Sequence, residues 1–402
     1  MRIVVAFVVS VVVVAGCSRD VAERPQREPA KLEQLAIPVG EIPRIWMQTD
    51  RAGGVLTGEA MRGAGEPVLR WSVSGVPVLD GLVWNRVAGQ VSPAAIDSSF
   101  ILPHRWDAWW SDNSTHSIRT LEEPVSRLHA FVLDIEFPSE RPLELAVRPP
   151  DGWEPSGLNG RGPVARWKSR AGVLAIYAGP DGVPAADGVR CPPSSRVRVL
   201  VLFNEGLVPD EDLVDVLARS DSLLAARELR LTSVLDRAYF NASDPLLTKA
   251  VRWFQLSLDG LLITTGDTTA IAGIPWDGAI DGRAIAQSMG GLDFALLDYP
   301  MVSSLARGLA RWQDTVGHHR TFGRIADRVS GGVATYGGAD VAPWFVREAY
   351  DHITRSRDTS LLRELYPVIR RSIEGTKRYQ TDTYNLVTHG DGETWMNSRS
   401  PD

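Results

Sequence analysis

Val197-Arg-Val-Leu-Val-Leu-Phe203 and the stretch from Asp210 to Leu231 decide the fold, because the spacing of apolar residues changes between them. The first segment is the last of several that follow the two-residue period of a β-strand. After Pro209 the period becomes 3.6 residues, as in an α-helix. The positions that carry this helical period are Leu213, Val216, Leu217, Leu223 and Leu224. We therefore expect a β-rich front half and a helical back half that meet near residue 209.

The front half, residues 41–208, contains further strand patterns separated by turn signals. The strand-like segments include Val68 to Val73, Leu128 to Ile135, Leu143 to Val147 and Val173 to Tyr177. Gly, Pro and Asp gather between them, for example in Pro149-Pro-Asp-Gly152 and Gly179-Pro-Asp-Gly182. Short alternating strands with regular turn signals are typical of an antiparallel β-sandwich.

The back half, residues 209–402, contains a series of amphipathic helices joined by alternately short and long loops. One helix opens at Ser243-Asp244-Pro245, where Ser or Asp can cap the helix and Pro fits its first turn. Pro367 is expected to break or kink a later helix. Long loops are expected from Thr264 to Asp281 and from Phe322 to Gly338. This arrangement predicts pairs of helices in a toroid, with the long loops on one face.

Five motifs in this half occur in the order seen in one enzyme family. They are Ala272-Gly-Ile-Pro275-Trp276, Asp281-Gly282-Arg283, Ser330-Gly-Gly332, Ala339-Asp340-Val-Ala-Pro343-Trp344-Phe345 and Gly392-Glu393-Thr394-Trp395-Met396. From about Leu231 to Asn397 the chain resembles the amylo-α-1,6-glucosidase family, the carboxy-terminal part of glycogen debranching enzyme. The resemblance implies an (α/α)6 toroid behind a β-sandwich, inverting hydrolysis of α-linked glucosyl units, and no metal or organic cofactor. Because six helix pairs need about twelve helices, and about half of them are predicted here, we expect an incomplete toroid from a truncated chain.

The resemblance also implies which residues hold the sugar. In the family, the loop after the Pro-Trp pair supplies an Arg and an Asp that grip the terminal glucose. Here Arg283 is present, but Ala284 stands in the place of the Asp, and Asp281 or Asp277 lies near enough to substitute. Asp340 can cap its helix or bind a sugar hydroxyl, and both interpretations stay open. The expected substrate-binding residues are Trp276, Asp277, Asp281, Arg283, Asp340, Trp344, Trp395 and Asn397.

The proton donor is expected in the segment from His389 to Asn397. The family's Thr-Trp-Met-Asp reads Thr394-Trp395-Met396-Asn397 here, and an amide cannot deliver a proton as a carboxylic acid does. The acid role can pass to Glu393 or Asp391, since burial against Trp395 would raise the pKa of a nearby carboxyl group. The structural alternative for Glu393 is a surface ion pair or a helix cap.

The amino terminus has the pattern of a bacterial lipoprotein signal. Arg2 precedes an apolar run that is too short to span a bilayer, and the run ends Val14-Ala15-Gly16-Cys17. This ending resembles a lipobox, in which the cysteine is acylated and becomes the mature amino terminus. We expect a signal peptide over residues 1–17, lipidation at Cys17 and a flexible tether over residues 18–40. The predicted location is the bacterial cell envelope, on the periplasmic or extracellular side.

Composition excludes several classes of protein. With Cys17 lipidated, Cys191 is the one remaining cysteine in the sequence, so no intrachain disulfide is expected. A net charge of −6 gives no electrostatic basis for nucleic-acid binding. No histidines occur at metal-binding spacing, so no metal site is expected.

Three functions stay open at this point. The first is a lipid-anchored inverting glycoside hydrolase that acts on an α-linked glucan or a glucosyl oligosaccharide. The second is a catalytically inactive carbohydrate-binding or scaffold lipoprotein, because Ala284 and Asn397 both replace expected carboxylates. The third is another toroidal hydrolase, of the trehalase-like or mannosidase-like kind.

Overall fold

The computed structural model describes residues 31–63, 68–87, 90–91, 94–122, 128–156, 163–185, 187–265, 268–271, 279–316, 319–330 and 332–394. The predicted signal peptide, the lipidation site Cys17 and residues 18–30 of the predicted tether lie outside these ranges. So do four of the predicted site residues: Trp276, Asp277, Trp395 and Asn397.

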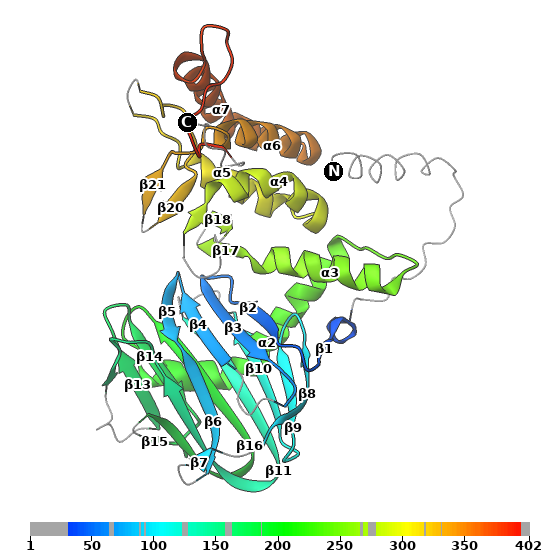
Figure 1. Cartoon of the computed structure of the whole chain (residues 1–402), viewed down its shortest axis with the longest axis vertical. Helices are drawn as coiled ribbons and strands as arrows, with labels where there is room; N and C mark the ends of the chain where they lie inside the picture. Colours follow the sequence, from blue (N-terminus) through cyan, green and yellow to red (C-terminus); the bar gives the residue numbers. More distant parts are fainter. Residues whose placement is uncertain are drawn as a thin grey trace. The chain divides into compact units, whose positions relative to one another are not determined.

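An antiparallel sheet of twelve strands dominates the described residues of the front half (Figure 1). Nine strands follow the spatial order β1 (Ile37–Val39), β8 (Ile96–Ile101), β9 (Trp106–Trp110), β10 (Thr115–Leu121), β11 (His129–Arg148), β16 (Gly188–Asn204), β14 (Val173–Tyr177), β13 (Val164–Lys168) and β12 (Glu154–Ser156). The remaining strands pair beside this path: β6 (Gly81–Val87), β7 (Gln90–Val91) and β15 (Val183–Ala185). The long strands β11 and β16 pair along most of their length and form the centre of the sheet.

A second antiparallel sheet packs against one face of the large one. It consists of β2 (Arg44–Thr49), β3 (Gly54–Ala60), β4 (Val68–Val73) and β5 (Val76–Leu79), in that order. Both sheets contribute to one apolar core, in which the Trp71 ring meets the Phe131 ring edge-on at 5.2 Å. The predicted antiparallel β-sandwich is therefore consistent with this part of the structure.

The end of the predicted tether is ordered and belongs to the fold. A short 3-10 helix, η1 (Leu32–Leu35), buries Leu32 and Leu35, and β1 pairs with β8. The indole Nε1 of Trp253 donates a hydrogen bond to the carbonyl of Leu35 at 2.7 Å. Residues 32–39 thus pack against the body of the protein, because their apolar side chains find partners there.

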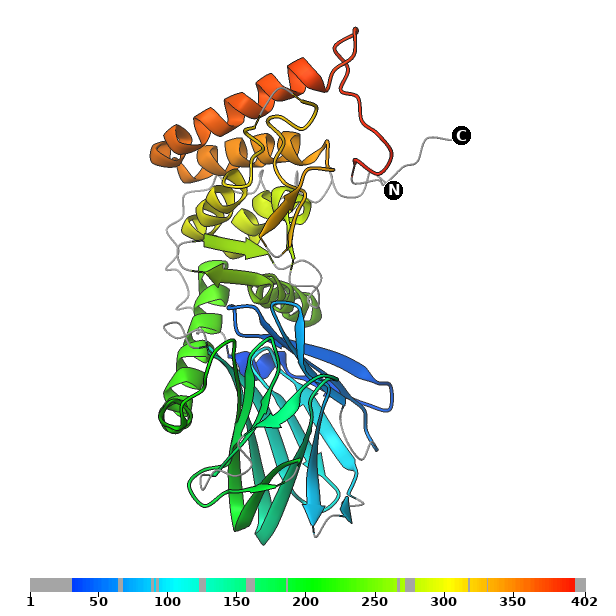
Figure 2. The ribbon, with the colours of Figure 1, turned by 90° about the vertical axis from the view of Figure 1, so that its left-hand side faces the viewer.

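One long helix, α2 (Asp210–Arg237), packs on part of the other face of the large sheet (Figure 2). Its first turn carries Asp210, Glu211 and Asp212, which favour the positive end of the helix dipole. Leu213, Val216 and Leu224 are buried in the same cluster as sheet residues of β11, β14 and β16. This helix is therefore a layer on the sheet.

Buried ion pairs join α2 to the sheet and to α3 (Pro245–Gly260). The Arg230 guanidinium donates to both oxygens of Glu122, at 2.8 and 2.7 Å, and also pairs with Asp259 on α3. Arg227, which is buried, donates to the carbonyl of Thr49 at 2.6 Å and lies 3.0 Å from Glu122. Such pairs fix the orientation of α2 relative to the sheet and to α3, because a charge that is removed from water is destabilising without its partner.

The rest of the back half combines helices with two small sheets. The helices are α4 (Gly282–Leu296), α5 (Tyr299–Ala310), α6 (Val341–Ser356) and α7 (Thr359–Tyr379). The small sheets are the hairpin β17 (Leu262–Thr265) with β18 (Thr268–Ile271), and β19 (Ile280–Asp281), β20 (Arg328–Ser330) and β21 (Val333–Thr335). No helix in the described part of the chain is both long and apolar enough to cross a membrane.

The predicted (α/α)6 toroid, complete or partial, is wrong. The described chain is mostly antiparallel sheet with six α-helices; α2 packs on the sheet, and strands lie between the other helices. A 3.6-residue period specifies which face of each helix is apolar, but it does not specify which neighbour covers that face. Helices with the expected spacing can therefore exist without forming the expected ring.

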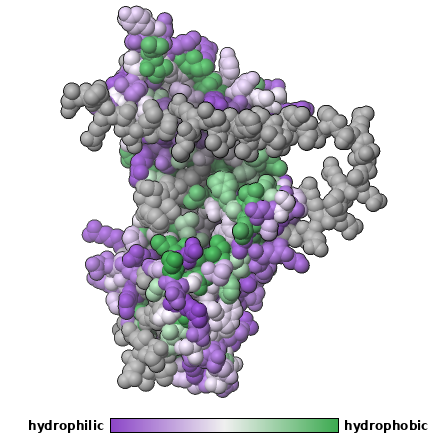
Figure 3. All heavy atoms as spheres, turned by 45° about the vertical axis from the view of Figure 1, so that its right-hand side comes forward, coloured by the Kyte–Doolittle hydropathy of each residue, from purple (hydrophilic) through white to green (hydrophobic). Residues whose placement is uncertain are grey.

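Several large apolar side chains remain exposed on the helices. They include Leu246 and Phe254 on α3, Phe294 on α4, Tyr350 on α6, and Leu362, Tyr366 and Ile373 on α7. Figure 3 shows apolar side chains on the surface at about the level of α3, between more polar regions. Scattered exposed apolar residues are common on protein surfaces. Here seven large apolar side chains on four helices are exposed, so within the described chain each of these helices has part of its apolar surface uncovered.

Candidate functional site

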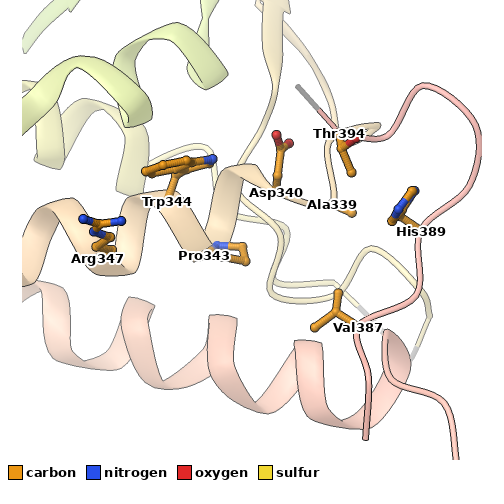
Figure 4. Close-up of a pocket in the computed structure, with 8 residues that line it drawn as sticks. All are labelled: Ala339, Asp340, Pro343, Trp344, Arg347, Val387, His389 and Thr394. Atoms are coloured by element: carbon orange, nitrogen blue, oxygen red, sulfur yellow. The ribbon is translucent and has the colours of Figure 1, made fainter. Parts of the chain in front are cut away.

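A pocket of about 390 Å³ lies where the start of α6 faces the C-terminal segment, residues 380–394 (Figure 4). Its lining residues are Ala339, Asp340, Pro343, Trp344, Arg347, Val387, His389 and Thr394. Aromatic and apolar side chains dominate this lining, and a few polar groups converge on it. That combination is typical of a site for a small organic ligand.

An ion pair positions Asp340 at the pocket. Asp340 precedes the first turn of α6 but makes no side-chain capping hydrogen bond. Its Oδ1 instead accepts a hydrogen bond from Nε of Arg283, at 3.1 Å, and both side chains are mostly buried. The pair connects the start of α4 to the start of α6, so the two motifs that contain these residues meet here.

Close backbone packing brings these loops together. A Cβ on Gly282 would lie 2.0 Å from the carbonyl oxygen of Ala326, and one on Gly338 would lie 2.6 Å from Val341. Both positions therefore need glycine. Asp281 caps α4 by accepting a hydrogen bond from the amide of Ala284 at 2.8 Å.

Trp344 forms the aromatic wall of the pocket. It is half-buried on α6, and the guanidinium of Arg347, one turn later, lies 5.6 Å from the centre of its ring. Figure 4 shows Trp344 and Arg347 along the same helix, with Asp340 and Thr394 close to each other nearer its start. A sugar ring can stack on a flat indole, while charged and hydroxyl groups bind its hydroxyls.

The C-terminal segment is fastened beside the start of α6 near its own end. The amide of Ala339 donates to the carbonyl of Glu393 at 2.7 Å, and within the segment the amide of Thr388 donates to the carbonyl of Gln380 at 2.7 Å. The Glu393 carboxylate lies 3.0 Å from Arg320 and 3.3 Å from Arg324. Arg324 is 1% exposed and also donates to the carbonyl of Tyr336. Glu393 therefore acts as the anchor that holds Thr394 and His389 at the pocket.

The environment of Glu393 favours its ionised form. Partial burial works to raise the pKa of this carboxyl group, but the hydrogen bond from the amide of Gly390 and the charges of Arg324 and Arg320 outweigh burial. The pKa is therefore lowered below its ordinary value, contrary to the expected rise. The ion pairs match the structural alternative for this residue, and an ionised carboxylate is a poor proton donor.

The lowered pKa of Glu393 makes the anchor sensitive to acid. A carboxyl group whose pKa is depressed by folding stabilises the folded state above its unfolded pKa of about 4.3, and this contribution is lost as the pH falls through the folded value. Glu393→Gln should therefore speed amide hydrogen exchange over residues 387–394 at pH 6–8. The difference from the wild-type protein should persist down to about pH 4 and disappear only when the pH falls below the lowered pKa of Glu393. Hydrogen exchange followed by mass spectrometry measures both effects.

Glu374→Gln is the matched control for this prediction. Glu374 makes an exposed ion pair with Arg370 on α7, four residues away in the sequence. Its replacement should leave exchange in residues 387–394 unchanged at every pH. Equal exchange in the Glu393→Gln and wild-type proteins at neutral pH would show that Glu393 does not anchor the segment.

A buried Ser, His and Asp form a second polar cluster, between α4, α5 and α6. Nδ1 of His352 lies 2.8 Å from Oδ1 of Asp293, and its Nε2 lies 2.9 Å from Oγ of Ser303. The order resembles a nucleophilic triad. However, His352 is 0% exposed and Ser303 is 4% exposed, so a substrate cannot reach the hydroxyl. The cluster is therefore structural.

This cluster, together with the Arg283–Asp340 pair, aligns two helices. Arg283 and Asp340 lie at the starts of α4 and α6, whereas Asp293 and His352 lie near their ends. The two helices therefore run parallel and are tied at both ends. A Cβ on Gly290 would lie 2.3 Å from the Glu348 carboxylate, so the helices also approach closely between these ties.

The structure brings together part of the predicted site. Asp340 and Trp344 line the pocket, Arg283 pairs with Asp340, and Glu393 and Asp391 lie on the segment opposite. Asp281 caps α4 and is not a lining residue. Trp276 and Trp395, two more of the expected substrate-binding residues, lie outside the described ranges.

Sequence reasoning missed four residues that shape the site: Arg347, His389, Arg320 and Arg324. Arg347 follows Trp344 by three residues on a helix, a spacing that could have identified it as a neighbour. Arg320 and Arg324 lie about seventy residues before Glu393, and no local pattern predicts that contact.

Within the described ranges, no group of three or more His, Cys, Asp or Glu side chains is placed to hold a metal ion. The sequence matches no protein-family model and no curated protein.

Proposed function

We propose that this protein is a carbohydrate-active lipoprotein whose pocket at the start of α6 holds a glucosyl unit of an α-linked glucan or oligosaccharide. In this proposal, Cys17 anchors the chain to the bacterial cell envelope. Trp344 stacks on the sugar ring, and Asp340, oriented by Arg283, accepts hydrogen bonds from the sugar hydroxyls. Thr394 and His389 contribute polar contacts from the opposite segment.

The observation that carries the proposal is the meeting of three separate motifs at one pocket. Asp340 and Trp344 belong to the motif from Ala339 to Phe345, Thr394 belongs to the motif from Gly392 to Met396, and all three line the pocket. Arg283, from the motif Asp281-Gly282-Arg283, does not line the pocket but pairs with Asp340. The resemblance to amylo-α-1,6-glucosidases selected these motifs from order and spacing alone, and their meeting at a pocket of about 390 Å³ supports a shared role in binding.

Inverting hydrolysis of the glucosidic bond is the first candidate activity. Besides a carboxylate base that activates water on the opposite face of the sugar, for which the resemblance implies a glutamate carboxy-terminal to the five motifs, it needs a carboxylic acid that protonates the leaving oxygen. Since Glu393 is held as a carboxylate by two arginines, we assign this role to Asp391, which is exposed on the same segment beside Gly392. The positive φ of Gly392, 71°, turns the chain directly after Asp391.

Binding without hydrolysis is the second candidate. The ion pairs of Glu393 favour it, because they remove one of the two predicted acids from proton transfer. Under this alternative, the pocket recognises glucan but does not cleave it.

One experiment on the purified full chain separates the two candidates. Maltotetraose and an α-1,6-branched oligosaccharide are titrated by calorimetry, and glucose release is followed in the same samples. For a hydrolase, Asp391→Asn should lower the rate of release at least about a hundredfold and leave the binding constant within twofold. Glu374→Gln, which removes an exposed ion pair on α7, should change neither quantity.

The outcomes differ clearly. Binding without glucose release by the wild-type protein would support the second candidate over the first. No detectable binding of either oligosaccharide would overturn the proposal as a whole.

A further inference from the structure

Three tryptophans lie within five residues on β9, and alternation divides them between the two faces of the sheet. Trp106 and Trp110 point into the core, where they are 0% and 2% exposed. Trp109 points to the outer face and is 42% exposed. The Phe100 ring on β8 meets the Trp109 ring edge-on, with centroids 5.7 Å apart and an interplanar angle of 89°. An indole that is held in place but uncovered therefore lies on the open face.

Polar side chains surround this aromatic pair in register across the sheet. Ser98 and Thr115 are the cross-strand partners of Trp109, and Ser117 is the partner of Asp107. Residues that pair across strands share a face. The indole is thus flanked by hydroxyl groups on both neighbouring strands, a pattern suited to the edges of sugar rings.

The charges on this face are balanced. Asp107 accepts a hydrogen bond from Arg105 at 2.7 Å, and Glu136 on β11 lies 3.6 Å from Arg196 on β16. A face with paired charges does not attract anionic nucleic acid or an anionic membrane. Its electrostatics instead match an uncharged ligand.

The apolar area is also too small for a protein interface. It consists of the Trp109 and Phe100 rings within a polar surface, whereas a stable protein partner covers about 800 Å² on each side. One exposed indole flanked by hydroxyls suits a single row of sugar rings.

We propose that this outer face, defined by Ser98, Phe100, Asp107, Trp109 and Thr115, is a second carbohydrate-binding surface, which holds the uncharged chain of a glucan polymer. The choice of glucan as the ligand rests on the function proposed for the pocket. Such a surface retains the polymer while the pocket binds a terminal unit. The pocket and this face use different aromatic residues, Trp344 and Trp109, so their contributions can be measured separately.

The test compares retention of the full-length chain on insoluble starch with calorimetric binding of maltotriose. Trp109→Ala should lower the retention constant on starch about three- to tenfold and leave maltotriose binding unchanged. Trp109→Phe, which keeps a flat ring, should restore most of the retention. Val183→Thr, an exposed apolar residue on β15, is the control and should alter neither quantity.

The Trp109→Ala and Trp344→Ala variants test the outer face and the pocket separately. Unchanged starch retention in Trp109→Ala would overturn the second surface, whether or not Trp344→Ala weakens maltotriose binding. Loss of retention in Trp109→Ala with no effect of Trp344→Ala would support the surface and contradict the pocket assignment. A change of oligomeric state in Trp109→Ala, measured by sedimentation, would assign the face to self-association and overturn the inference.

Discussion

His352→Leu is expected to lower the free energy of unfolding by about 3–5 kcal/mol. The imidazole lies between the Asp293 carboxylate and the Ser303 hydroxyl, with all three side chains buried. Leucine fills much of the space but donates no hydrogen bond, so among the described residues the carboxylate of Asp293 keeps only Arg355, whose Nε lies 3.3 Å from it. A buried charge that loses a partner costs far more than an exposed one.

Chemical denaturation followed by circular dichroism measures this effect. The matched control is Asp351→Asn, one position earlier on the same helix, where an exposed pair with Arg347 spans 4.0 Å. Its cost should stay below about 1 kcal/mol. If His352→Leu also costs less than about 1 kcal/mol, the buried cluster does not tie α4, α5 and α6 together.

Trp344→Ala is expected to weaken maltotetraose binding at least about tenfold, a loss of about 1.4 kcal/mol. The indole is the one large aromatic surface among the residues that line the pocket in the described chain. Because Trp344 is only half-buried, the fold should survive its removal, and the thermal midpoint should fall by only a few degrees.

Two variants sharpen this second prediction. Trp344→Phe should recover part of the affinity, because a smaller flat face remains. Tyr350→Ala removes an exposed aromatic side chain from the same helix outside the pocket, and it should leave binding unchanged. If Tyr350→Ala and Trp344→Ala reduce affinity equally, the pocket is not the site.

Local sequence patterns correctly predicted the starts of two helices, which depend on interactions between neighbouring residues. The cap at Asp244 is confirmed, since its side chain accepts a hydrogen bond from the amide of Leu246, and Pro245 begins α3. The change of period after Pro209 correctly placed the start of α2. Both features depend on residues that are neighbours in the sequence, so they can be predicted from the sequence alone.

Elements that depend on tertiary packing were not predictable. Of the break or kink expected at Pro367, the break is wrong: α7 runs from Thr359 to Tyr379 through the proline, with Leu361 and Leu365 buried before it and Ser372 buried after it. The hairpin of β17 and β18 extends into the loop predicted from Thr264 to Asp281. In both cases tertiary contacts decide the conformation, which local propensity does not reveal.

The candidate site also has a part that local sequence patterns predict and a part that depends on tertiary contacts. Order and spacing identified Asp340, Trp344 and Arg283, because each belongs to a motif. The geometry that joins them depends on contacts across 57 residues for Arg283 with Asp340 and 69 residues for Arg324 with Glu393. The ionised state of Glu393 follows from such contacts, and a rise in its pKa was therefore the wrong expectation.

Hydrogen exchange with and without saturating maltotetraose shows which segments of the chain contact the bound sugar. If a glucosyl unit binds at the start of α6, exchange should slow over residues 339–347 and 387–394, and a Trp344→Ala variant should need at least about tenfold more maltotetraose for the same protection. Protection confined to other parts of the chain, or none at a concentration where calorimetry detects binding, would contradict the assignment of this pocket.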